Sequence, residues 1–231
     1  MRIRIKFAIS SLLLLLLALN SGCTTTTGIK KKLTTDDLLG IKDLVIETQV
    51  KQPFDIYLSR DNETGTGFAI GGLLGATIES SIRTSNDREL SEPLVQQLIN
   101  FRLQAVIEAN LEKSLGTSGL FETISTVPPG QMHGSLSSGQ ARLEIIVNRW
   151  GYRRSSANDK QVTAFMECSI SLTRGDTSKE VWQYDTQLFS HNTYYPEHLS
   201  NDIESVRTDM RGLAARLANR ITNELKYAPN Q

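Results

Sequence analysis

Three stretches in the second half of the chain alternate apolar and polar residues, and this pattern constrains the fold more than any other feature. They lie near 143–148, 162–172 and 181–189, and short polar segments at 151–160 and 174–177 separate them. Alternation with a period of two is typical of strands with one face on a core and the other in solvent. Because the connections are short, the sequence predicts an antiparallel meander.

A long amphipathic helix is predicted after the meander, from about Leu199 to Lys226. Its apolar residues recur about every 3.5 positions and form one stripe, made of Ile203, Val206, Met210, Leu213, Leu217 and Ile221. A stripe of this kind needs an apolar surface to cover it. We therefore expect the helix to lie on the sheet of the meander.

A second helix is predicted in the middle of the chain, from Ser91-Glu92-Pro93 to about Leu115. Serine is a favourable N-cap, proline is tolerated in the first turn, and Gly116 suits the end of the helix. Short strands are predicted at 44–50, 54–58 and 119–124. The expected fold class is α+β: a mostly antiparallel sheet of about four to six strands, packed by the mid-chain helix and the long C-terminal helix.

An apolar segment at 65–82 is unusually rich in glycine. Gly67, Gly71 and Gly75 are spaced four apart, so on a helix they would share one face and let another backbone approach closely. That arrangement suits packing against a membrane or a second subunit. The alternative is a glycine-rich apolar loop that leads into a helix buried against the sheet. The apolar part is about 11 residues long, too short to span a bilayer.

The first 22 residues have the composition of an export signal. Three basic residues, Arg2, Arg4 and Lys6, precede an apolar run from Phe7 to Leu19. As a helix this run of about 13 residues would measure about 20 Å, which is less than the roughly 30 Å of a bilayer core. The pattern therefore predicts a secretory signal rather than a spanning anchor.

The residues that follow, Asn20-Ser21-Gly22-Cys23, resemble the lipobox of bacterial lipoprotein precursors, in which an aliphatic residue and two small residues precede cysteine. Asn20 departs from the class, which usually has leucine there. The resemblance implies that Cys23 is acylated and that the signal before it is removed. In a Gram-negative envelope, Thr24, which is not aspartate, implies the outer membrane, facing the periplasm. The alternative is an ordinary cleaved signal followed by an incidental cysteine.

Three parts of the chain are predicted from these features: a lipoprotein signal peptide at 1–22, a polar tether at 23–38 after the lipidated cysteine, and one periplasmic α/β domain at 39–231. The tether is assigned because residues 24–37 are polar and lack apolar periodicity. Its lysines, Lys30, Lys31 and Lys32, could also contact anionic headgroups as an accessory to the acyl anchor.

The order of elements between about residues 90 and 225, with the phrase Ser118-Gly119-Leu120-Phe121, is similar to small periplasmic domains of outer-membrane lipoproteins. These include the penicillin-binding-protein activators and the curli-secretion type. The resemblance implies an accessory protein, such as an envelope-assembly protein or an ABC transport auxiliary. It assigns no partner-binding residue to this chain.

Candidate catalytic and metal-binding residues are few. His191, Glu197 and His198 are close in the sequence, but their spacing matches no zinc motif, and a surface turn is the simpler interpretation. Cys168 falls on the apolar face of its strand, which favours a buried thiol over a nucleophile. We therefore expect no enzymatic activity, no cofactor and no metal.

The distribution of charge argues against a nucleic-acid partner. The chain has 25 Lys and Arg residues and 25 Asp and Glu residues, and three of the basic residues lie in the signal, which has no acidic residue. The other 209 residues therefore carry a net charge of about −3 and no basic block. Binding to phosphates needs clustered lysine and arginine side chains.

One cluster of cationic and aromatic residues is a candidate interaction site: Arg149, Trp150, Tyr152, Arg153 and Arg154. Such residues at a strand end suit recognition of a carboxylate, a glycan or a protein partner. The alternative is a hairpin edge whose charges discourage strand pairing.

The sequence as a whole predicts a lipid-anchored periplasmic binding or accessory protein of an envelope complex, with a membrane contact through its lipid and an envelope protein as partner. The alternative is a structural lipoprotein that forms homo-oligomers, or contacts the membrane, through its glycine-rich segment.

Overall fold

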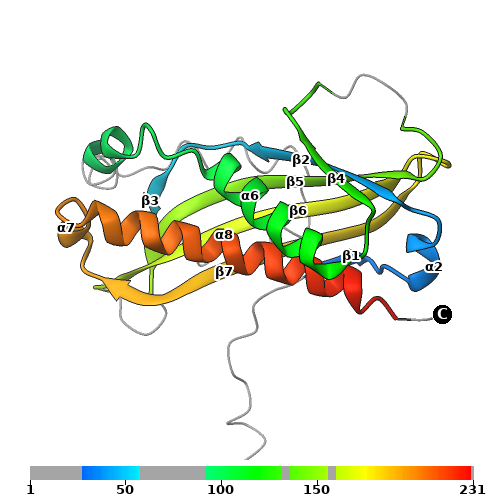
Figure 1. The fold of residues 1–231 in the computed structure, drawn as a ribbon. Helices are drawn as coiled ribbons and strands as arrows, with labels where there is room; N and C mark the ends of the chain where they lie inside the picture. Colours follow the sequence, from blue (N-terminus) through cyan, green and yellow to red (C-terminus); the bar gives the residue numbers. More distant parts are fainter. Residues whose placement is uncertain (1–27, 58–91, 132–135, 156–159, 230–231) are drawn as a thin grey trace, which may run out of the picture.

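The computed structural model describes residues 28–57, 92–131, 136–155 and 160–229 (Figure 1). The signal peptide, Cys23 and the glycine-rich segment with Gly67, Gly71 and Gly75 lie outside the described residues. The expectations for them therefore stay predictions.

One mixed sheet of seven strands forms the framework of the described chain. Its order is β1 (Gly28–Lys31), β7 (Glu180–Tyr194), β6 (Val162–Arg174), β5 (Gln140–Arg154), β2 (Asp43–Val50) and β4 (Thr123–Val127), and β3 (Asp55–Tyr57) also pairs with β5. The predicted meander is confirmed, because β5, β6 and β7 pair antiparallel in sequence order. In contrast, β2 and β3 run parallel to β5, and β4 runs parallel to β2, so the sheet is larger and more parallel than expected.

Two helices, α6 (Leu103–Ser118) and α8 (Ile203–Lys226), lie side by side on one face of this sheet (Figure 1). The predicted stripe of α8 is buried at Val206, Met210, Leu213, Leu217 and Ile221. In α6 the buried residues are Leu103, Ile107, Leu111 and Leu115, each four positions from the next. Each of these side chains contributes about 2 kcal/mol relative to an exposed one. The α+β class and the long C-terminal helix are therefore confirmed.

The mid-chain helix is not continuous. A short helix covers 92–97, a turn follows, and α6 begins at Leu103. The short helix buries Leu94 and the turn buries Leu98, whereas α6 buries the residues named above. The two pieces therefore pack through separate sets of apolar side chains. The helix also ends later than predicted, at Gly119 rather than Gly116. Gly119 has a φ of 69°, a left-handed conformation that glycine adopts readily at a helix end.

The segment from residue 28 to 38 belongs to the fold and is not a tether. Here β1 pairs antiparallel with β7, and Leu33 is buried. Next comes a short helix, α2 (Thr35–Leu38), and Thr34 donates from its backbone N and its hydroxyl to Asp37, at 2.9 and 2.7 Å. The folded part therefore begins at residue 28 instead of 39. The polar composition of this segment predicts a tether wrongly, because an edge strand such as β1 is held by backbone hydrogen bonds and does not need apolar side chains.

The start and the end of the described chain meet beside α2. The backbone N of Thr35 donates to the carbonyl of Pro229 at 3.1 Å, and its hydroxyl donates to the carbonyl of Ala228 at 2.9 Å. A further short helix, α7 (Pro196–Leu199), joins β7 to α8. No helix among the described residues combines the length and the apolar character needed to cross a membrane.

A β-bulge in β5 decides which of its side chains face the helices. Val147 pairs with Cys168 and Arg149 pairs with Glu167, so Asn148 is an extra residue in the register. Before the bulge the odd-numbered residues 141–147 are buried, and after it Trp150 and Tyr152 are. An extra residue reverses the alternation of a strand, and here it turns Trp150 toward the helices.

Candidate interaction groove

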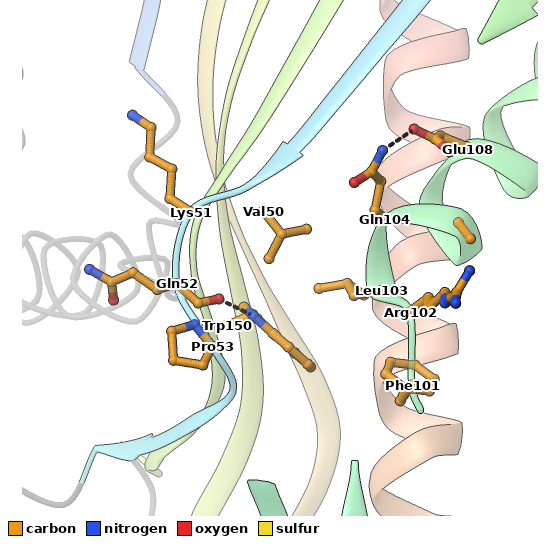
Figure 2. A pocket seen from close by; sticks show the side chains of 11 residues that line it. Val50, Lys51, Gln52, Pro53, Phe101, Arg102, Leu103, Gln104, Glu108 and Trp150 are labelled. Atoms are coloured by element: carbon orange, nitrogen blue, oxygen red, sulfur yellow. Dashed lines mark hydrogen bonds between the residues drawn. The ribbon is translucent and has the colours of Figure 1, made fainter. Parts of the chain in front are cut away.

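An open groove of about 570 Å³ lies between the β2–β3 connection and the start of α6 (Figure 2). Its apolar lining residues are Val50, Pro53, Phe101, Leu103, Ala105 and Trp150, and its polar ones are Lys51, Gln52, Arg102, Gln104 and Glu108. We call it the Trp150 groove. Figure 2 shows Val50 and Leu103 on opposite walls of the groove, with Trp150 below both of them in this view.

Trp150 is held firmly in this groove. Its indole Nε1 donates to the carbonyl of Gln52 at 2.8 Å, which ties β5 to the β2–β3 connection. The ring of Phe54 meets it edge-on with centroids 5.3 Å apart, and the ring of Phe101 lies 6.3 Å away. Arg211 of α8 places its guanidinium 6.0 Å from the Phe101 ring. Trp150 is therefore a rigid, preformed part of the floor rather than a mobile surface residue.

The polar residues of the groove form a rim. Gln104 donates through Nε2 to Glu108 Oε1 at 2.9 Å, one turn further along α6. Lys51 and Gln52 point away from the apolar space in Figure 2. Among the lining residues that the structure describes there is no histidine, cysteine or serine that could act as a nucleophile or a base. This arrangement can bind apolar groups and orient them by the rim.

A polar network around the buried Asp209 fastens α8 to the sheet. Asp209 of α8 accepts hydrogen bonds from the Tyr152 hydroxyl at 2.8 Å, the Ser190 hydroxyl at 3.0 Å and the Asn192 side-chain amide at 3.0 Å. Asp209 is only 6% exposed. Burial, with a further contribution from the nearby Asp209 carboxylate, raises the pKa of Tyr152 far above its ordinary value. The tyrosine therefore stays protonated and donates to Asp209, which is a structural role.

The five residues of the predicted cationic and aromatic cluster do not form one exposed surface. Trp150 and Tyr152 are buried on the helix side. Arg149 donates to both carboxylate oxygens of Glu167, from Nε at 2.7 Å and from a terminal nitrogen at 3.1 Å. Arg153 lies 4.1 Å from the centroid of the Phe189 ring. The expectation of a single exposed cluster is wrong because the pleat of β5 sends neighbouring residues to opposite faces.

Trp150 alone of these five residues lines the groove, and the other walls come from residues that the sequence did not single out. Val50 is the last residue of a predicted strand, and the sequence places Phe101 and Leu103 within one continuous helix. The turn before α6 places these two beside Val50. A break in the apolar periodicity at 98–102 was the available signal. It does not specify which strand the two sides of the break would meet.

His191, His198 and Cys168 form no site among the residues that the structure describes. His198 meets the Tyr195 ring edge-on, with centroids 5.8 Å apart. In the described part of the chain no three His, Cys, Asp or Glu residues are placed to hold a metal ion, so His191, Glu197 and His198 are not brought together as ligands. Cys168 is fully buried, as predicted, and burial raises the pKa of its thiol far above the ordinary value.

No family model matches this chain, and no curated protein matches it. Several solved structures align with a large part of this chain. The PelC dodecamer from Paraburkholderia phytofirmans is 10% identical, with 89% of this chain and 100% of that chain covered, at a TM-score of 0.40. Protein XCC0632 from Xanthomonas campestris is 9% identical, with 80% and 85% covered, at 0.42.

Lipoprotein GNA1162 from Neisseria meningitidis is 15% identical, with 79% of this chain and 99% of that chain covered, at a TM-score of 0.23. At these TM-scores none of the three likenesses carries an argument about this chain.

Proposed function

We propose that the chain is a lipid-anchored accessory protein of a bacterial envelope complex, held at the outer membrane through Cys23 and facing the periplasm. It acts by binding an apolar part of a partner protein in the Trp150 groove, without catalysis. The N-terminal signal and its lipobox-like end support the location. The groove supports the mode of action.

The Trp150 groove supports the binding role because it is open, already formed and lined by both apolar and polar side chains. Its volume of about 570 Å³ is within the usual range of about 300 to 1,000 Å³ for binding pockets. Preformed sites bind more tightly because less conformational freedom is lost on association. The apolar lining residues that a partner can reach are the partly buried Val50 and Phe101 and the exposed Pro53 and Ala105. One buried leucine-sized side chain would contribute about 2 kcal/mol.

Filling the groove is expected to abolish binding. In Gln104→Trp the new indole projects from the groove wall of α6 and occupies the space between Val50 and Leu103. We expect peptides selected from a random display library on the wild-type chain to bind this variant at least about 10-fold more weakly, equivalent to about 1.4 kcal/mol. The measurement is a titration followed by fluorescence anisotropy of the labelled peptides.

The matched control is Lys113→Trp, which adds the same side chain to the same helix at an exposed position outside the groove. It should bind the selected peptides as the wild type does. Equal affinity of the wild type and Gln104→Trp, or equal loss in both variants, would refute the groove as the binding site.

Removing the lipidation residue is expected to release the protein from the membrane. The wild-type chain should mature to a species that begins at Cys23, carries acyl mass and fractionates with the outer membrane. Cys23→Ala should lack this species. Two or more acyl chains anchor a protein stably in a membrane, whereas a protein without acyl chains keeps only weak surface contacts. Intact mass and membrane fractionation measure both results. A soluble, unlipidated wild-type protein would show that Asn20 prevents lipobox processing.

A further inference from the structure

The two edges of the sheet differ in how they are protected. β1, at one end, has the sequence Gly-Ile-Lys-Lys, its pairing with β7 is irregular between Ile29 and Lys31, and Lys30 forms a 2.6 Å ion pair with Asp185. Lysines and bulges on an edge strand discourage pairing with another chain. β4, at the other end of the described sheet, has the sequence Thr-Ile-Ser-Thr-Val, without a charge or a proline.

The outer side of β4 presents backbone groups that can pair. The N of Thr123 donates to the carbonyl of Lys42 at 3.4 Å, and Thr123 pairs with Asp43 in the register, so Thr123 bonds to β2. Alternate residues of a strand bond to the same neighbour, so Ser125 and Val127 continue this ladder and the residues between them face outward. The outward groups are the N and O of Ile124 and Thr126. No turn or loop of the described residues bonds to these groups.

We propose that β4 pairs antiparallel with β4 of a second copy of this chain, so that two sheets join into one. A two-fold axis through Ser125 places Ser125 opposite its own counterpart and Thr123 opposite Val127. This register forms about four hydrogen bonds between the outward groups. The inference is independent of the Trp150 groove and of the lipid anchor.

A second copy fits this edge because β4 is complementary to itself. In a two-fold antiparallel pair a central charged residue would face an identical charge, which is destabilising. β4 has none, and the charge at its start is balanced because Glu122 lies 3.2 Å from Lys42 in an ion pair. The β-branched residues Thr123, Ile124, Thr126 and Val127 favour strand pairing. Pro128 and Pro129, which lack N–H groups, limit the edge of each copy to the same short length.

Cysteine crosslinking tests this register directly. In the proposed pair the two Ser125 residues form a non-hydrogen-bonded pair with Cα atoms about 4.5 Å apart, within the range of about 4.4 to 6.8 Å that a disulfide spans. The full chain with Ser125→Cys and Cys23→Ala, in mild detergent, is expected to form a disulfide-linked dimer on gentle oxidation. The control is Ile29→Cys in the same background, which places an exposed cysteine on the protected edge β1. We expect at least about 10-fold less dimer from the control.

The oligomeric state gives a second measurement that needs no crosslink. Sedimentation of the full chain carrying Cys23→Ala should give the mass of a dimer. Adding Ser125→Lys should give a monomer, because two ammonium groups would face each other at the axis. The proposal is overturned if the Cys23→Ala chain is monomeric, if Ser125→Lys remains dimeric, or if Ile29→Cys crosslinks as efficiently as Ser125→Cys. A dimer that survives Ser125→Lys would be assigned to another surface.

Discussion

Gly151→Ala is expected to lower the free energy of unfolding by about 4 kcal/mol. A Cβ atom at this position would lie 1.8 Å from the carbonyl oxygen of Asp55 and 2.9 Å from its carbonyl carbon. These are backbone atoms of β3, so no side-chain rotation can relieve the clash. The φ of Gly151, 140°, is also one that residues with a side chain rarely adopt. The substitution must therefore displace β3 from β5.

Urea unfolding followed by circular dichroism measures this effect. Gly116→Ala is the matched control, because Gly116 lies within α6 and nothing lies within 4 Å of an added Cβ. That variant should be more stable than the wild type by about 0.5 to 1 kcal/mol, since alanine is the better helix former. An unchanged unfolding midpoint for Gly151→Ala would contradict the close approach of β3 and β5.

Peptide binding should fall in the same Gly151→Ala variant. Gln52 and Pro53 connect β2 to β3, and both line the Trp150 groove. A displaced β3 moves this connection and with it the acceptor of the Trp150 indole, the carbonyl of Gln52. One substitution outside the groove therefore links the stability of the sheet to the shape of the groove.

Asp209→Ala is expected to cost about 3 to 4 kcal/mol of unfolding free energy. It removes the acceptor of three donors, the Tyr152 hydroxyl, the Ser190 hydroxyl and the Asn192 amide, and of these Asn192 is exposed and can bond to water instead. Tyr152 is fully buried, so its stranded hydroxyl is not compensated by water. The network joins α8 to β5 and β7, so the loss should weaken the packing of the helix on the sheet.

The comparison that isolates the network is a double-mutant cycle with Tyr152→Phe. The single change Tyr152→Phe removes one donor and leaves Asp209 with two, so it should cost only about 1 kcal/mol. The double variant should be less destabilised than the sum of the single variants, because no tyrosine hydroxyl is then left stranded. Denaturant unfolding measures all three. A cost below about 1 kcal/mol for Asp209→Ala, or strict additivity, would contradict the coupling.

The meander and the stripe of α8 were predictable because they depend on local periodicity. A period of two from Val162 to Leu172 and a period near 3.5 along α8 require one buried face whatever the rest of the chain does. The buried state of Cys168 follows from the same alternation. These features follow from the burial of apolar side chains at regular intervals along the sequence.

The parallel part of the sheet was not predictable in this way. Asp43 pairs with Thr123 on one side and with Gln140 on the other, and both partners are far away in the sequence. An alternating pattern indicates that a segment forms a strand. It does not identify the strand with which that segment pairs, because backbone hydrogen-bonding groups are the same in every strand. The same reason explains why the sequence predicts a tether where β1 lies. Its polar residues give no apolar signal, and its order comes from pairing with β7.

The sequence therefore established the fold class, the meander and the C-terminal helix, since each follows from the hydrophobic effect acting on nearby residues. Tertiary structure alone decided the Trp150 groove and the division of the arginine and aromatic cluster. A single extra residue at Asn148 reverses the alternation of β5 and turns Trp150 inward, where the turn before α6 brings Phe101 and Leu103 beside it. Strand register and the meeting of distant segments depend on the packing of the whole chain, which no local pattern encodes.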